Sequence, residues 1–367
     1  MSRLIRLTIA LIVLLVFVPQ VTRADGPMPY EKALACVQKV LPASSYSTNE
    51  YLPSGEVTGP TPGGFKKKYP VRLGFPWIAN DEETQFYIAQ ALGYFAEEGL
   101  EVEFVSGGPG KDHIQSLGGG AVDIGVAAGG EAIQFARTST TPIDVMAVGT
   151  LLKDAPLGYI TLKPELQGRE LTPQDLIGRT IGVQPGGDLY VYMILDKAGI
   201  ARDKVTIIDA DFTPAVILTG RADYYAGWVM NQPRILEEET QEHPSYKGKW
   251  NILMFHKWAF SEPSDTIVVR SETLKTDEGR DMVKRFLRAT YRGTKFMLDK
   301  PIDAAEIAAK FSTDVQITPA QALSRFEKQK ALVVGTDKLG LLAMDPDQWD
   351  KVAASLVQYG QLKLDCK

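Results

Sequence analysis

The stretch that decides the fold runs from Tyr69 to Gly130, and its first strand and loop read Val71-Arg72-Leu73-Gly74-Phe75-Pro76-Trp77-Ile78-Ala79-Asn80. A helical segment follows, and then a second strand over 101–105 enters the glycine-rich loop 106–110. A third short strand follows the glycine-rich turn at 118–125. This alternation of strands and helices is typical of an open α/β sheet, in which ligands bind at the carboxyl ends of the strands.

The second half of the chain repeats this order. Thr172 and Pro173 are suited to a helix start, and strand 180–184 leads into the loop 185–188 and a helix. Gly119-Gly120-Ala121-Val122-Asp123 has its counterpart in Gly220-Arg221-Ala222-Asp223. The repetition predicts two similar α/β lobes with a ligand cleft between them, closed by a hinge. We expect lobe 1 to comprise residues 69–155 and 255–367, including the C-terminal helices, and lobe 2 to comprise 156–254.

The N-terminus has the pattern of a secretory signal peptide. Arg3 and Arg6 precede the apolar run Leu7–Val18, which is too short to span a bilayer. Cleavage after Ala24 would define residues 1–24 as the signal and direct the mature chain to the periplasm or outside the cell. An uncleaved anchor is the alternative. A lipoprotein signal at Cys36 is disfavoured, because that residue lies well past the apolar run.

The net charge and the few histidines argue against a nucleic-acid-binding protein and against a metalloprotein. The net charge is −5, and loss of the three arginines of the signal takes it to −8, which argues against nucleic-acid binding. The three histidines are widely scattered, so we expect no metal site and no cofactor.

Two cysteines, Cys36 and Cys366, lie near the two ends of the mature chain. In an oxidising compartment they are candidates for a disulfide, although spacing alone leaves two free thiols equally open. Residues 25–68 form an N-terminal extension, with a short helix expected over 30–41. The remainder is rich in Ser, Pro, Gly and Thr and is expected to be a linker or a segment wrapped on the surface.

Candidate binding residues in lobe 1 follow its strands. Trp77 would stack on a flat ring or pack at the hinge, and Asn80 would bind a heteroaromatic edge or cap a helix. Glu83 would bind an amino group or favour the helix dipole. The remaining candidates are a tyrosine of the following helix, the backbone of the glycine-rich loop, which suits a carbonyl or anionic group, and a glutamate at a helix start: Tyr87, Gly107, Gly108, Gly110 and Glu131.

Lobe 2 offers the equivalent loop and helix, where the candidates are Gln184, Gly187, Asp188 and Tyr190. Asp188 is also a plausible helix cap. Trp228 and Asn231 follow the last strand of this lobe, and Trp228 facing Trp77 would enclose a ring. No nucleophile–base pair lies in these loops, which favours binding over catalysis.

Several motifs carry a family resemblance between Tyr69 and Phe311. They comprise Trp77-x-x-Asn80 with Tyr87, and then in order Gly93-Tyr94-Phe95-Ala96-Glu97-Glu98-Gly99-Leu100, Gly107-Gly108-Pro109-Gly110, Gly119-Gly120-Ala121-Val122-Asp123, Asp175-Leu176-Ile177-Gly178 and Asn231-Gln232-Pro233. The layout resembles periplasmic solute-binding proteins of ABC importers. It is most similar to the branch that binds thiamine pyrimidine precursors or riboflavin, within the superfamily of nitrate-, sulfonate- and taurine-binding proteins.

The resemblance implies a non-enzymatic, monomeric protein that passes a small heteroaromatic ligand to an inner-membrane ABC permease. Nitrate, sulfonate or another small anion is the alternative ligand, and a sensory role is a further alternative. The same fold hosts a synthase of the thiamine pyrimidine. That enzyme has His where this chain has Glu83, and a cysteine-rich segment where residues 260–265 contain none. Gln232 replaces a Glu common in relatives and leaves the exact ligand open.

Overall fold

The computed structural model describes residues 28–65, 67–108, 111, 113–336 and 338–366. The predicted signal peptide and Gly110 lie outside these residues. Within the described part of the chain, no helix is both long and apolar enough to cross a membrane.

The first sheet has five strands in the order β2-β1-β3-β10-β4. β1 pairs in parallel with β2 and β3, whereas β10 pairs antiparallel with β3 and β4. A strand from late in the chain therefore lies inside a sheet whose other strands come from the first part of the chain, between β3 and β4. The strands are β1 (Tyr69–Gly74), β2 (Leu100–Val105), β3 (Ile124–Gly129), β4 (Val145–Leu152) and β10 (Ser264–Arg270).

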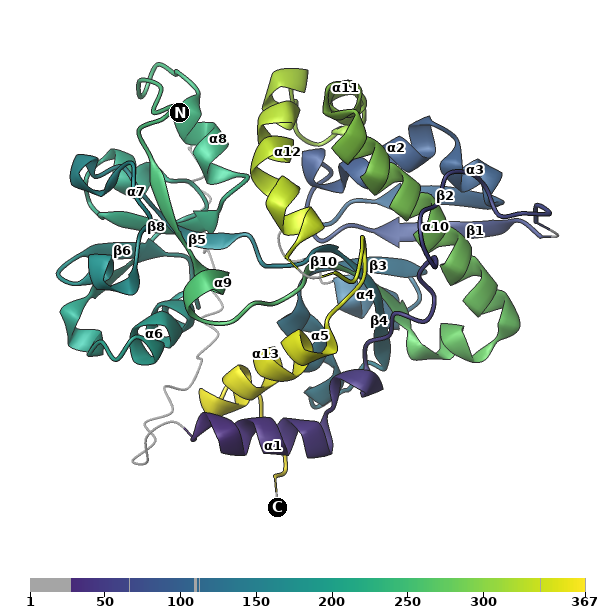
Figure 1. Cartoon of the computed structure of the whole chain (residues 1–367), viewed down its shortest axis with the longest axis horizontal. Helices are drawn as coiled ribbons and strands as arrows, with labels where there is room; N and C mark the ends of the chain where they lie inside the picture. The colour runs from purple at the N-terminus through teal and green to yellow at the C-terminus, as the bar shows by residue number, and fades with distance from the viewer. Residues whose placement is uncertain (1–27, 66, 109–110, 112, 337, 367) are drawn as a thin grey trace, which may run out of the picture.

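The second sheet repeats this arrangement in the order β7-β6-β8-β5-β9. β6 is parallel to β7 and β8, and β5 is antiparallel to β8 and β9. The strands are β5 (Leu157–Thr161), β6 (Thr180–Val183), β7 (Thr206–Asp209), β8 (Tyr224–Trp228) and β9 (Asn251–Met254). The chain crosses from the first sheet to the second between β4 and β5 and returns between β9 and β10, which makes these two segments the connections between the lobes (Figure 1).

The two Gly-x-x-Asp turns, 120–123 and 220–223, perform the same task in each sheet. Asp123 accepts a hydrogen bond from the backbone N–H of Arg72 at 2.9 Å, and its own N–H donates to the carbonyl of Arg72. Asp223 makes the same two contacts with the backbone of Thr180, at 2.9 and 2.8 Å. Each aspartate thus joins the start of the third strand of its unit to the first strand, which explains why the motif occurs twice.

The helices surround the sheets and add a C-terminal group (Figure 1). They are α1 (Tyr30–Val40), α2 (Thr84–Ala91), α3 (Tyr94–Glu97), α4 (His113–Gly118), α5 (Gly130–Thr138), α6 (Asp188–Lys197), α7 (Ala215–Leu218), α8 (Gln232–Glu237), α9 (Phe255–Trp258), α10 (Asp277–Asp299), α11 (Pro301–Phe311), α12 (Pro319–Val334) and α13 (Pro346–Gln358). α10 and α11 pack on α2 of the first lobe. α12 contacts both β4 and α8, so it stands at the boundary between the lobes.

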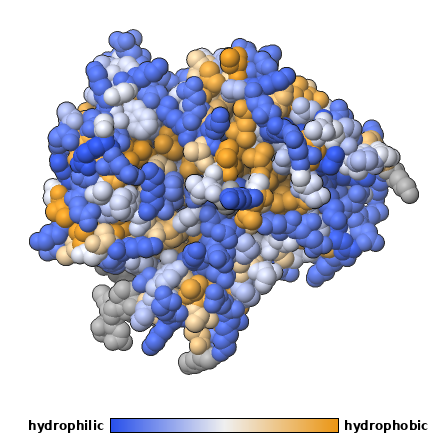
Figure 2. All heavy atoms as spheres, in the orientation of Figure 1, coloured by the Kyte–Doolittle hydropathy of each residue, from blue (hydrophilic) through white to orange (hydrophobic). Residues whose placement is uncertain are grey.

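Hydrophilic residues cover much of the face shown in Figure 2, while hydrophobic residues gather near its middle, beside α12. A cluster of buried apolar residues includes side chains from both sides of this boundary, among them Met297 of α10, Phe326 of α12 and Met230 of the second lobe. The boundary therefore shares a core with the C-terminal helices.

The N-terminal extension packs on the first lobe. The predicted helix is present as α1 and lies beside α13. Beyond it, Tyr46 is fully buried and its carbonyl accepts a hydrogen bond from Ala147, and Thr48 donates to the carbonyl of Ala147. Part of the edge of β4 is thereby paired, which protects a strand edge that would otherwise invite association.

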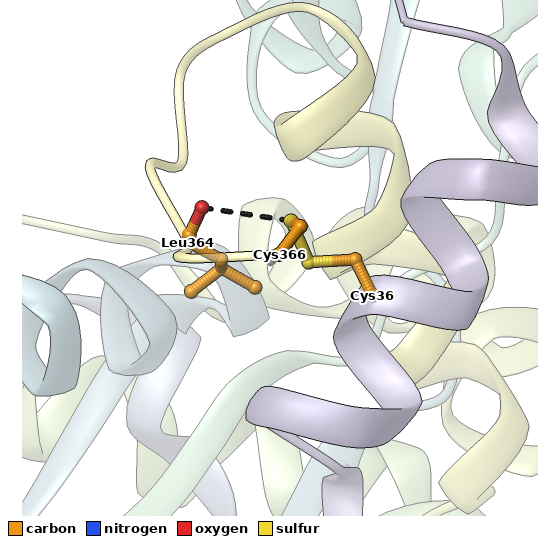
Figure 3. Close-up of a disulfide and its surroundings, with 3 residues drawn as sticks. All are labelled: Cys36, Leu364 and Cys366. Carbon is orange, nitrogen blue, oxygen red and sulfur yellow. Dashed lines mark hydrogen bonds between the residues drawn. A yellow bond between two sulfur atoms is a disulfide. The ribbon is translucent and has the colours of Figure 1, made fainter.

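A disulfide joins Cys36 of α1 to Cys366, with the two Cα atoms 5.2 Å apart (Figure 3). The extension and the C-terminal segment are therefore covalently linked, on the side of the first lobe that carries α1 and α13 (Figure 1). The described cysteines are both in this bond.

Candidate functional site

A cavity of about 280 Å³ lies between the two sheets, beside both crossing segments. The first sheet and α5 supply one wall, the second sheet and α6 supply the other, and the crossing segments complete it. The lining residues are Ala128, Gly129, Glu131, Ala155, Pro156, Leu157, Tyr159, Gln184, Pro185, Gly186, Gly187, Tyr190, Ala226, Trp228, Glu262 and Ser264. A space bounded by both lobes at their connections is a usual place for a ligand.

Aromatic side chains dominate the lobe 2 wall. Tyr159 of β5 is fully buried, yet its hydroxyl has no protein partner, and burial raises its pKa, so the phenol stays protonated. The ring of Tyr190 packs edge-on against Phe255, with centroids 5.2 Å apart. Trp228 ends β8, and its backbone N–H donates to Gln232 at 2.7 Å. Rings held in this way offer flat apolar surfaces with hydroxyl groups available for recognition.

A tight turn brings the start of α6 to the cavity. The N–H of Gly187 donates to the carbonyl of Gln184 at 2.9 Å, and a Cβ on Gly187 would lie only 3.0 Å from that oxygen. The Gln184 amide donates to the hydroxyl of Tyr225 at 2.6 Å, which holds the side chain in place. Glycine at position 187 therefore allows its backbone to lie close to the carbonyl group of Gln184.

Two carboxyl groups face the cavity from lobe 1 and the returning segment. Glu131 stands in the first turn of α5, and Glu262 precedes β10 and is 4% exposed. Burial raises the pKa of Glu262 well above its ordinary value, and the charge of Glu131 and a hydrogen bond to it raise it further. The same two carboxyl groups, Glu131 first, together with burial raise the pKa of the Tyr190 hydroxyl.

A second group of buried charges lies nearby, where α12 meets both lobes; we call it the Arg325 cluster. It comprises Asp81, Glu82, Glu83, Asp265, Arg234 and Arg325. Arg325 Nε lies 3.0 Å from Asp81 Oδ1, and Arg234 lies 3.7 Å from the other oxygen of Asp81. Arg325 also donates to the side chain of Asn231 in the second lobe.

The carboxyl groups of the Arg325 cluster titrate abnormally. Burial, followed by the charge of Glu82, raises the pKa of Glu83 and holds it well above its ordinary value. Burial and Glu82 have the same effect on Asp265, against the opposing charge of Arg325. The described residues contain no group of three or more His, Cys, Asp or Glu arranged to hold a metal ion. In the Arg325 cluster, contacts join Arg325 and Arg234 to Asp81, and Arg325 to Asn231.

The structure brings some of the predicted site residues together. The lining includes Glu131, Gln184, Gly187, Tyr190 and Trp228. Among the described candidates, the others lie outside the lining of this cavity: Trp77, Asn80, Glu83, Tyr87, Gly107, Gly108, Asp188 and Asn231.

Trp77 and Asn80 occupy the loop after β1. Trp77 is 36% exposed, and its ring centroid lies 6.1 Å from that of Phe212, which follows β7 in the second lobe and is 67% exposed. The ring near Trp77 in the second lobe is therefore that of Phe212, and not that of Trp228 as expected. Asn80 accepts a hydrogen bond from Glu82 N–H and donates to the carbonyl of Ile78, so its side chain caps the turn before α2.

The remaining candidates make structural contacts. Tyr87 is buried and its ring stacks on Phe311, with centroids 5.5 Å apart. A Cβ on Gly107 would meet His113 and the carbonyl of Phe75 at 2.3–2.4 Å, so close packing requires glycine there. Asp188 is the first residue of α6.

Sequence reasoning did not identify Tyr159, Glu262 or Ser264. Tyr159 lies within a strand that reads as core, and Ser264 begins β10 with its hydroxyl donating to the carbonyl of Ala128. Glu262 lies in the stretch 260–265, where the sequence indicated only the lack of cysteine. An acidic residue shortly before a strand was the available signal.

The sheets, their shared topology and the cavity between them define the two-lobed α/β fold of periplasmic binding proteins. The periplasmic aliphatic sulphonate binding protein SsuA from Escherichia coli has this fold. The two structures superpose with a TM-score of 0.57 at 13% identity, over 80% of this chain and 88% of SsuA.

Residues 80–304 match the family model described as NMT1/THI5 like, and the chain belongs to this family. The formylaminopyrimidine-binding protein of Halalkalibacterium halodurans is 28% identical over 65% of this chain and 69% of its own length. The 4-amino-5-hydroxymethyl-2-methylpyrimidine phosphate synthase of Legionella pneumophila is 26% identical over 77% of this chain and 84% of its own length. The family thus includes both binding proteins and enzymes.

Proposed function

We propose that this protein is the solute-binding component of an ABC-type importer. It captures a small heteroaromatic compound, of the thiamine-pyrimidine-precursor type, in the cavity between the lobes. Hinge closure at the two crossing segments retains the ligand until a membrane permease receives it. The predicted signal peptide over residues 1–24 supports export to the periplasm, where such a component acts.

One observation carries this proposal: among the residues that the structure describes, the cavity is lined by aromatic rings, an amide and two carboxyl groups, and by no Lys, Arg or His. Nitrate or a sulfonate would enter a site of negative charge without a cationic partner, which is strongly unfavourable. A flat heterocycle with donor groups finds ring surfaces and hydrogen-bond acceptors there. The lining therefore favours a heteroaromatic base over the oxyanions that are the alternative ligands.

The size of the cavity supports a small member of that class. Ligand pockets commonly enclose about 300–1,000 Å³, and this cavity, with about 280 Å³, is slightly smaller than that range. A single-ring pyrimidine is therefore favoured over a three-ring flavin.

Binding is also favoured over catalysis. The family resemblance implies that the synthase carries His at the position of Glu83, and Glu83 is buried in the Arg325 cluster instead of the cavity lining. The segment 260–265 brings Glu262 to the cavity in place of cysteine-type ligands. The lining residues thus supply recognition groups, and no thiol or imidazole nucleophile is among them.

Native mass spectrometry of the mature protein, followed by isothermal titration calorimetry, tests the function. The probes are 4-amino-5-hydroxymethyl-2-methylpyrimidine, its formylamino relatives, riboflavin, nitrate and aliphatic sulfonates. We expect saturable binding of a pyrimidine, lost or weakened at least tenfold in Trp228→Ala, because a stacked ring loses its partner. Binding of an oxyanion alone would overturn the proposal, and turnover of a bound pyrimidine would assign the chain to the enzymes.

A further inference from the structure

Glu131 and Glu262 meet in the cavity from two separate parts of the chain. Both side chains line the cavity, and the charge of Glu131 acts on the buried carboxyl group of Glu262. Each residue keeps its Oε2 atom buried without a hydrogen-bond partner among the described residues. Oε2 of Glu131 occupies the space next to Gly129, where a Cβ would lie 2.1 Å away. Gly129 thus makes room for the carboxyl pair at the end of β3.

The pair has no cation to balance it. Two like charges in one buried site disfavour each other, and the pKa of Glu262 is raised by burial and by Glu131, so the pair is expected to hold one proton and carry a single negative charge. The lining residues contain no Lys, Arg or His. In the Arg325 cluster, by contrast, Arg325 and Arg234 face the buried carboxylate of Asp81. A buried negative charge without a protein partner creates a place for a positive charge brought by a ligand.

Other groups in the lining restrict the shape of that ligand. The hydroxyl of Tyr159 is buried and unpartnered, and the Tyr190 hydroxyl lies within the field of both glutamates. Trp228 and Tyr190, which are both partly exposed, contribute rings to the lining. A flat ring is therefore expected to carry its positive charge at one edge, directed toward the carboxyl pair.

We propose that Glu131 and Glu262 act together as the specificity determinant of this cavity, selecting a basic heterocycle whose amino group is adjacent to a ring nitrogen. This inference rests on the proposed function and names the edge of the ligand that the site reads. Once the ring nitrogen is protonated, such an edge presents two parallel N–H donors, which match carboxylate oxygens in a bidentate manner.

The proton balance needs no further reactant. The empty pair holds one proton, and a neutral base enters with a free electron pair on its ring nitrogen. The O–H bond of the pair breaks as the N–H bond of the ring forms. Two carboxylates then face one cationic ring, and the total charge of the site is unchanged.

The experiment compares 4-amino-5-hydroxymethyl-2-methylpyrimidine with its 4-oxo analogue, which presents a carbonyl oxygen in place of the amino group. Affinities are measured by calorimetry for the mature wild-type protein, Glu262→Gln and Glu131→Gln. The control is Glu306→Gln, since Glu306 is exposed on α11. Circular dichroism and thermal unfolding check that each variant is folded.

We expect the wild type to prefer the amino compound. In Glu262→Gln its affinity falls about 10- to 100-fold, the range for losing a hydrogen bond to a charged group, while affinity for the oxo compound changes little. The preference ratio therefore collapses. Glu131→Gln has the same effect, and the double variant loses no more than about either single one, because the two act as a unit. Glu306→Gln leaves the ratio unchanged.

An unchanged ratio in folded Glu262→Gln and Glu131→Gln, with pyrimidine binding retained, overturns this inference and leaves the proposed function standing. Equal loss of both compounds overturns it as well, since that indicates a general effect on the cavity. Trp228→Ala calibrates such a general loss, because ring stacking does not distinguish the amino from the oxo edge. If no pyrimidine binds the wild type, the proposed function fails and this inference fails with it.

Discussion

The boundary between the lobes buries carboxyl groups in two places, but it supplies arginines in only one. In the Arg325 cluster, Arg325 and Arg234 approach Asp81 to 3.0 and 3.7 Å. In the cavity, Glu131 and Glu262 face each other with no basic residue in the lining. Asp81 is thus paired with arginines in one place, where Glu83 and Asp265 still keep buried oxygens without a partner among the described residues, whereas the carboxyl pair of the cavity has no arginine in its lining.

This difference separates structural from recognition roles. An arginine paired with buried carboxylates connects the elements that carry them, here α12, the start of α2 and the second lobe. Carboxyl groups that lack such a partner make the empty protein less stable and leave their binding capacity available. The contrast predicts that substitutions in the Arg325 cluster and in the carboxyl pair of the cavity change the stability of the empty protein in opposite directions.

The largest effect is expected from Arg325→Met, which leaves the carboxylates of the Arg325 cluster without their main counter-charge. Removing one partner of a buried ion pair lowers the free energy of unfolding by about 3–5 kcal/mol. Urea denaturation followed by circular dichroism measures this loss. Lys330→Met is the matched control, because Lys330 is exposed on the same helix, and we expect a change within about 0.5 kcal/mol. Equal stabilities of the two variants would show that the cluster does not hold the boundary.

A smaller effect of opposite sign is expected from Glu262→Gln in the empty protein. The folded pKa of Glu262 is raised above its ordinary value of 4.5, so the folded state binds the proton more tightly than the unfolded state. The stability contributed by this proton is complete below pH 4.5 and is lost as pH rises toward the folded pKa. Glu262→Gln has no carboxyl group at this position, so its stability does not fall with pH for this reason.

We therefore expect the stability of Glu262→Gln relative to wild type to increase with pH, by an amount of the order of 1 kcal/mol. Thermal or urea unfolding at pH 4, 5.5 and 7 without ligand measures it. A difference that is independent of pH would mean that Glu262 titrates normally and would remove the contrast between the two places.

The smallest effect concerns a contact between the lobes that has no charge. The rings of Trp77 and Phe212 lie 6.1 Å apart, and a double-mutant cycle with Trp77→Ala and Phe212→Ala is expected to give a coupling of about 0.5–1.5 kcal/mol. Ile302→Ala is the control, since Ile302 is 68% exposed on α11. A coupling near zero would leave the charged and polar contacts as the chief links across the boundary.

The α/β fold was predictable because its signals are local. The Gly-x-x-Asp turns and the alternation of strands and helices indicate two similar units, and both units have the same strand order in the structure. The site was predictable only in part. Gln184, Gly187 and Tyr190 come to the cavity because the loop after a central strand opens at the carboxyl edge of the sheet. The equivalent loop of lobe 1 instead places Asn80 as a cap and Glu83 in the Arg325 cluster.

The sequence by itself determined the fold class, the repeated units and the helix over the start of the extension, because hydrophobic periodicity and turn chemistry act over a few residues. The tertiary structure decided which polar residues share a space. Glu131 and Glu262 are 131 positions apart in numbering and meet only because β10 returns between β3 and β4. Cys36 and Cys366 meet because α1 packs on α13. Such juxtapositions depend on long-range packing, which leaves no periodic signal in the chain.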